Sequence, residues 1–123
     1  MQASLSLFSP QVLEAWVGLA RADDLVRRNT VLADLTLGLR NTQTGEQIRW
    51  TIREQEVQAG VGEGAVAFWL EGDSDAFAAL AAGFPFNRLV RQHRLVVGGD
   101  LRACVQNWML IYALTRLTSR LEY

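Results

Sequence analysis

The first part of the chain carries apolar residues at helical spacing. Ser9 and Pro10 open it, because a serine side chain can cap free backbone amides and proline tolerates the first helical position. The apolar residues that then share one helical stripe are Val12, Leu13, Trp16, Val17 and Ala20. The pattern ends at Asp23-Asp24, because Asp24 would place a charge on this stripe. We therefore expect an N-terminal helix over residues 9–28 that breaks at this acidic pair, which caps a further turn through Arg28.

From residue 31 the apolar spacing changes from helical to alternating. The alternation defines four runs, residues 31–39, 48–52, 57–61 and 66–70. Turn residues separate them, notably Asn41 to Gly45 and Gly60 to Gly64. Because successive alternating runs joined by turns are typical of hairpins, the pattern predicts a meander of four strands with one apolar face.

Shorter elements follow the fourth run. An acidic group at 73–75 and Gly83 bracket a predicted short helix over 76–82. Residues 87–92 predict another short helix, residues 94–97 a fifth strand, and residues 100–120 a long helix capped by Asp100. No repeat or linker interrupts this order, so we expect one domain over residues 1–123, with the sheet and its helices over 31–121. The predicted class is α+β, with helices covering a five-stranded, largely antiparallel sheet.

The predicted C-terminal helix is apolar on two sides. One stripe holds Leu101, Cys104, Val105, Trp108, Ile111 and Tyr112, and a second holds Ala103, Leu110, Leu114, Leu117 and Leu121. One sheet can bury only one stripe. The other must face a ligand, the N-terminal helix or a second copy of the chain, and the pattern alone does not choose among them.

Two segments resemble the sterol-carrier-protein-2 family. Residues 73–83, DSDAFAALAAG, are similar to the family's acidic-capped short helix ending in glycine. Residues 92–100, QHRLVVGGD, are similar to its final strand followed by glycine and a polar helix cap. The resemblance spans about residues 32–117. It departs at His93, where the family more often has glycine, and at Phe84-Pro85-Phe86, which replaces a more polar connector.

The resemblance implies a hydrophobic tunnel between the sheet and its helices. It implies a non-catalytic carrier for an apolar ligand, such as a fatty acyl chain, a sterol-like molecule or an isoprenoid quinone. The side chains expected to line the tunnel are Trp50, Phe68, Phe77, Leu80, Phe84, Phe86, Leu101, Val105, Trp108 and Tyr112. These side chains could equally fill a core, and the alternative is then a homodimerising or scaffold domain without a ligand. Helices of this family pack on one another over the sheet, so we expect the second stripe to be covered within the chain.

Composition and charge limit the partners and the compartment that we expect. Twelve basic and thirteen acidic residues give a net charge of -1, so the whole chain has no broad field that attracts nucleic acid or an anionic membrane. Cys104 is the single cysteine, which excludes an intramolecular disulfide and fits a reducing, cytoplasmic compartment. The longest apolar run, residues 108–114, is far shorter than the roughly 20 residues that span a bilayer. The chain ends in Leu121-Glu122-Tyr123 rather than a peroxisomal signal, so we expect a bacterial relative.

Candidate residues for catalysis or metal binding are few. His93 is the only histidine and lies eleven residues from Cys104, on a different predicted element, so we expect no metal site, cofactor or catalytic residue. The Gly60 to Gly64 loop joins two strands and is interpreted as a turn rather than a phosphate loop. Arg88, Arg91 and Arg94 could meet a lipid headgroup or an acidic partner, although a solvated face is the simpler interpretation.

Overall fold

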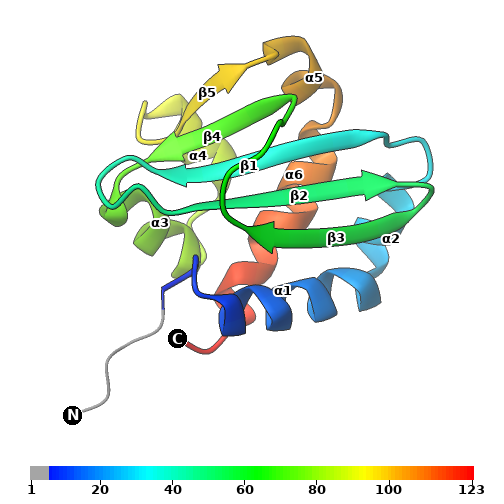
Figure 1. Ribbon diagram of the computed structural model, residues 1–123, viewed down its shortest axis with the longest axis horizontal. Helices are drawn as coiled ribbons and strands as arrows, with labels where there is room; N and C mark the ends of the chain where they lie inside the picture. The colour runs from blue at the N-terminus through cyan, green and yellow to red at the C-terminus, as the bar shows by residue number, and fades with distance from the viewer. Residues whose placement is uncertain (1–5) are drawn as a thin grey trace.

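The computed structural model describes residues 6–123 of the chain, which fold into the helices and strands of Figure 1. In chain order they are α1 (Pro10–Ala22), α2 (Asp24–Asn29), β1 (Leu35–Asn41), β2 (Gln47–Arg53), β3 (Glu56–Val61), β4 (Phe68–Gly72), α3 (Ser74–Ala81), α4 (Phe86–Arg91), β5 (Val96–Gly99), α5 (Leu101–Gln106), α6 (Trp108–Thr115) and the 3-10 helix η1 (Arg116–Arg120). The predicted α+β class and its five strands are confirmed. The first strand begins later than predicted, because residues 31–34 form a turn in which Leu32 is 97% exposed.

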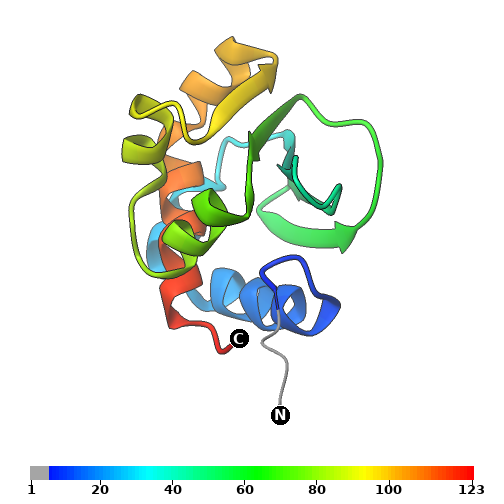
Figure 2. The ribbon, with the colours of Figure 1, turned by 90° about the vertical axis from the view of Figure 1, so that its left-hand side faces the viewer.

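The sheet is mixed, with strand order β3-β2-β1-β4-β5. β1, β2 and β3 form the predicted antiparallel meander, but β4 pairs with β1 in parallel, so the meander is wrong at the fourth strand. The connection from β3 crosses the outer face of the sheet and delivers β4 to the free edge of β1 (Figures 1 and 2). Backbone hydrogen bonds hold both ends of the crossing, from Gly62 N to Gln47 O at 2.9 Å and from Ala67 N to Thr36 O at 2.8 Å. Alternation could not reveal this, because a strand shows the same alternation beside either neighbour.

The core lies between the inner face of the sheet and the helices α1 and α6 (Figure 2). Trp16 of α1 meets Trp50 of β2 edge to face, with ring centroids 4.7 Å apart. The Trp16 indole also donates a hydrogen bond to the Leu114 carbonyl of α6 at 2.9 Å. Both rings are buried, so one side chain ties α1, the sheet and α6 together, as expected for the first and last helices.

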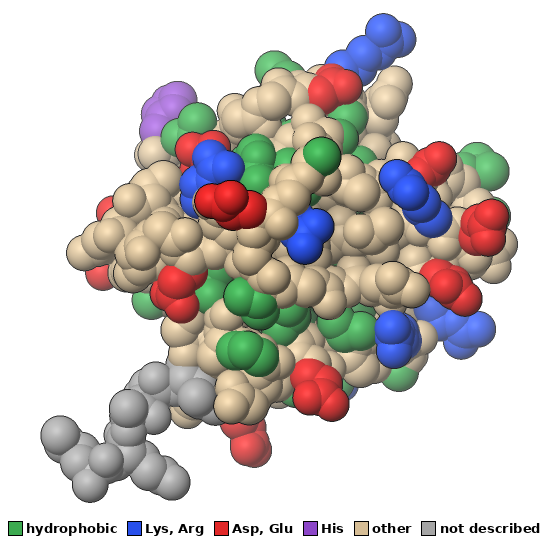
Figure 3. Space-filling model, in the orientation of Figure 1, with side chains coloured by type: hydrophobic (Ala, Val, Ile, Leu, Met, Phe, Trp, Pro, Cys, Tyr) green, Lys and Arg blue, Asp and Glu red, His purple; other side chains and the backbone are tan. Residues whose placement is uncertain are grey.

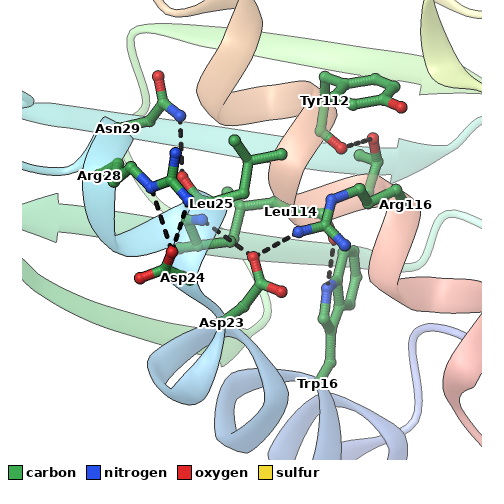
Figure 4. Close-up of polar contacts among 11 residues, drawn as sticks. Trp16, Asp23, Asp24, Leu25, Arg28, Asn29, Tyr112, Leu114 and Arg116 are labelled. Carbon is green, nitrogen blue, oxygen red and sulfur yellow. Dashed lines mark hydrogen bonds and ion pairs between the residues drawn. The ribbon is translucent and has the colours of Figure 1, made fainter.

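The break between α1 and α2 falls at Asp23, as the acidic pair predicted (Figure 4). The Asp23 carboxylate accepts the Val26 amide at 3.0 Å and pairs with Arg116 at 2.5 Å. Burial alone would raise the pKa of Asp23, but the Val26 amide and the Arg116 guanidinium outweigh burial and hold that pKa below its ordinary value. The cap of a short helix thereby also anchors the C-terminal end of the chain.

The C-terminal helix is not continuous, which corrects the prediction. It bends at Asn107, which has φ -110° and ψ 21° and whose side chain donates to the Ala103 carbonyl at 2.8 Å beside the bond from its own backbone amide to that carbonyl. It ends at Arg120, as predicted. The second stripe is covered within the chain, since Leu110, Leu114 and Leu117 are at most 2% exposed.

Candidate ligand-binding site

A cavity of about 570 Å³ opens between the N-terminal segment, the β1–β2 turn, α3 and the C-terminal residue. Its apolar wall consists of Leu7, Phe8, Phe77, Ala78, Ala81 and Ala82, and its polar rim of Ser6, Asn41, Thr44, Glu46, Ser74 and Tyr123. Clefts of roughly 300–1,000 Å³ with mostly apolar walls are typical of small-molecule sites. The cavity therefore has the size and lining of a site for an apolar molecule.

Helix α3 builds the apolar wall because large and small residues lie side by side on it. Asp73 caps the helix by accepting the Ala76 amide at 2.9 Å, and Gly83, with φ 102°, ends it. Phe77 packs edge to face on Phe8, with ring centroids 4.9 Å apart. The alanines one turn further along α3 leave open the space that larger side chains would fill.

The polar rim is largely satisfied by its own hydrogen bonds. The buried Asn41 side chain donates to the Ser74 hydroxyl at 3.1 Å and accepts the amides of Gln43 and Thr44. The Tyr123 hydroxyl donates to the Thr118 carbonyl at 2.7 Å, and burial raises the pKa of Tyr123 to about 12. Among the described residues lining this cavity, Glu46 is the only charged side chain. The rim thus offers oxygen atoms and one negative charge to a ligand headgroup.

The structure divides the ten predicted ligand-binding residues among four environments. Phe77 lines the cavity, whereas Leu80, Phe84, Phe86 and Tyr112 line a smaller one of about 110 Å³ between α3, α4 and the end of α6. Trp50 and Phe68 are buried core residues, and Trp108 packs on Phe86 with ring centroids 4.6 Å apart. Leu101 and Val105 are 60% and 61% exposed. Ligand binding by these residues stays a prediction, but they do not surround one common space.

The sequence reasoning missed most of the cavity wall. Leu7 and Phe8 precede the first predicted helix and belong to no periodic pattern. Residues 76–82 were predicted only to form a short helix, although small residues beside Phe77 on one helix were an available signal. Tyr123 gave no signal, because only the folded chain brings it to α3.

The two residues considered for catalysis or metal binding have structural explanations. His93 adopts φ 60°, a left-handed conformation that glycine adopts more easily. Cys104 is buried, and burial raises the pKa of its thiol to about 11, so it is a neutral core side chain near neutral pH. Within residues 6–123 no three His, Cys, Asp or Glu side chains are grouped to hold a metal ion. None of the helices described is both long and apolar enough to cross a membrane.

Solved structures with this arrangement of elements include sterol carrier protein 2. A crystal structure of sterol carrier protein 2 matches with a TM-score of 0.80 at 14% identity, over 94% of this chain and 99% of that one. The ubiquinone synthesis protein UbiJ-SCP2 matches at 0.64 and 18% identity, over 88% and 98%. Sterol carrier protein 2 from Aedes aegypti in complex with palmitate matches at 0.56 and 18% identity, over 89% and 98%.

The chain therefore has a sterol-carrier-protein-2-like fold, which confirms the resemblance seen in the sequence. No family model matches the sequence, and neither does any curated protein. At 13% to 18% identity the likeness to these structures is one of fold.

Proposed function

We propose that this protein is a non-catalytic binding or carrier domain for an apolar, lipid-like ligand. The observation that carries the proposal is the cavity of about 570 Å³ with an alanine and phenylalanine wall. A neighbour of the same fold was determined with palmitate, which supports a ligand with an acyl chain. Retention would come from removing apolar surface from water, at about 0.8 kcal/mol for each buried CH₂ group.

The rim favours a ligand with an uncharged headgroup. Glu46 is the only charged side chain among the described lining residues, so a carboxylate held there would meet a like charge without a basic partner. A hydroxyl, ester or quinone oxygen carries no such penalty. We propose that neutral lipids, such as an acyl alcohol, an acyl ester or an isoprenoid quinone, are preferred over free fatty acids.

Filling the cavity tests the proposal. Ala78 lines the cavity and is exposed, so Ala78→Trp places an indole in it at little cost to the core. Titration of the wild-type protein with a fluorescent acyl ester should saturate near one site, and the variant should bind at least about tenfold more weakly. Ala15→Trp is the matched control, because Ala15 is an exposed alanine of α1 that lies outside this wall. Unsaturable binding by the wild type, or equal binding by both variants, would contradict a ligand site here and favour the scaffold alternative.

A further inference from the structure

One end of the molecule exposes several large apolar side chains. α4, β5, α5 and the start of α6 gather at the end opposite α1 and the C-terminus (Figures 1 and 2). The large apolar side chains exposed on its helices are Leu101, Val105, Met109 and Tyr112, at 37% to 61%. We call this surface the α5 face.

The α5 face lies on the side of α5 and α6 that points away from the core. Cys104 and Ile111 are fully buried, so α5 and α6 already bury one side. The exposed positions 101, 105, 109 and 112 recur at helical spacing on the other side. Backbone hydrogen bonds of the helical type continue through the bend, from Asn107 N to Ala103 O and from Ile111 N to Asn107 O. Contiguous exposed apolar side chains on a monomer are typical of interaction surfaces.

Charge is also unevenly distributed. Residues 84–112 contain four arginines, Arg88, Arg91, Arg94 and Arg102, and one acidic residue, Asp100. All four arginines are exposed, and Asp100 caps α5 by accepting the Ala103 amide at 3.1 Å. The rest of the chain holds eight basic and twelve acidic residues. Two of those acidic residues lie beside this segment: Glu71, which pairs with Arg40, and Asp75, whose carbonyl accepts the Arg94 guanidinium at 3.4 Å. The segment is therefore more basic than the chain as a whole, whose net charge is -1. The outer face of the sheet, in contrast, mixes both signs (Figure 3) and pairs Arg40 with Glu71.

We propose that the α5 face docks on the surface of an anionic lipid bilayer. Its apolar side chains would enter the headgroup region while the arginines contact lipid phosphates, as in amphipathic helices that lie in the interface. A second copy of the chain fits less well, because a two-fold dimer through this face would bring two sets of arginines together. The proposal stands on exposure and charge at this end and does not depend on the ligand cavity.

Vesicle flotation tests the apolar part of the proposal. The wild-type protein should bind vesicles of phosphatidylcholine mixed with phosphatidylglycerol, bind pure phosphatidylcholine weakly, and dissociate as salt is raised. Leu101→Asp combined with Val105→Asp should weaken binding by about tenfold or more. Val31→Asp combined with Leu32→Asp is the matched control, since these residues are 56% and 97% exposed in a loop outside the α5 face. The control should bind as the wild type does.

A second pair of variants tests the charge. Arg91→Gln with Arg102→Gln should lower affinity for the mixed vesicles by about fivefold for each arginine. Arg53→Gln with Arg120→Gln, exposed arginines outside residues 84–112, should lower it much less. Thermal unfolding and acyl-ester binding should be unchanged in all four variants, which separates docking from folding and from the proposed carrier function.

Three results would overturn the docking proposal. The first is equal binding of the wild type to both vesicle types. The second is equal loss in the α5-face variants and their controls. The third is evidence that the face binds a protein partner. That evidence would be a wild-type dimer in light scattering that Val105→Asp converts to a monomer, or retention on an immobilised acidic protein in place of vesicles.

Discussion

The two ends of this molecule expose apolar side chains in opposite ways. At the cavity end, the phenylalanine and alanine side chains of α3 and the N-terminal segment surround a hollow whose described rim has Glu46 as its only charge. At the α5 end, Leu101, Val105 and Met109 are exposed on helices in a segment that is rich in arginine. A hollow can enclose a small molecule, whereas projecting side chains can only contact a larger partner. Shape and local charge, rather than hydrophobicity, therefore distinguish a ligand site from a docking surface.

The largest expected effect is the difference in stability between substitutions on the buried and on the exposed side of the C-terminal helices. Leu114 is 2% exposed beside the Trp16 indole, so Leu114→Asp buries a charge and should destabilise the fold by about 4 kcal/mol or more. Leu101→Asp, at a residue 60% exposed, should change stability by less than about 1 kcal/mol. Urea unfolding of both variants checks this, with light scattering to follow mass. A folded, stable Leu114→Asp monomer from a dimeric wild type would show that a second subunit covers this stripe.

The next effect concerns the Asp23 anchor between α1, α2 and the C-terminal end. Asp23→Asn should lower the free energy of unfolding by about 1–2 kcal/mol, because it weakens a cap and removes a pair whose Asp23 side chain is 11% exposed. Asp24→Asn breaks only the exposed pair with Arg28 (Figure 4) and should have no measurable effect. If both variants lowered the thermal unfolding temperature equally, the Asp23–Arg116 pair would stabilise the fold no more than the exposed Asp24–Arg28 pair does.

The same anchor predicts a pH dependence. The pKa of Asp23 is lowered in the folded chain, so its contribution is present above the pKa of unfolded aspartate and is lost as pH falls through the lower, folded value. The difference in stability between wild type and Asp23→Asn should therefore be constant near neutral pH and narrow in acid. A difference that widened in acid would reverse the assigned direction of the pKa shift.

A smaller effect concerns the headgroup at the cavity end. An acyl ester should bind several-fold more tightly than the matching fatty acid at neutral pH, because the carboxylate meets Glu46. Glu46→Gln should reduce that preference while leaving ester binding unchanged, as competition against one fluorescent probe can measure. Equal preference in the wild type and Glu46→Gln would mean that the headgroup does not lie at this rim.

The smallest effect lies at the α5 end, in the turn before β5. His93→Gly should raise the free energy of unfolding by no more than about 0.5 kcal/mol, since relief of the positive φ is partly offset by the greater freedom of unfolded glycine. Gln92→Gly, at φ -84°, has no such strain to relieve and should destabilise by about 0.5–1 kcal/mol. Chemical unfolding can compare the two, and a destabilised His93→Gly protein would contradict the strain argument.

The sequence by itself determined the elements of this fold, because their signals are local. Helical and alternating periods, the acidic caps at Asp23, Asp73 and Asp100 and the glycine at 83 locate most helices and strands within a few residues. The second stripe of the last helix was also correctly expected to be covered within the chain. The periodicity did not predict the bend of the C-terminal helix at Asn107, whose side chain bonds to the Ala103 carbonyl.

Only the tertiary structure decided which elements meet. The crossing of the β3–β4 connection places β4 beside β1, and no periodicity specifies that pairing. The cavity lining combines Leu7, Phe77 and Tyr123, which lie far apart in the sequence. Trp50 and Phe68, two of the aromatic residues predicted to line a tunnel, are buried in the core, because period and hydrophobicity tell which face of an element is apolar but not what covers it.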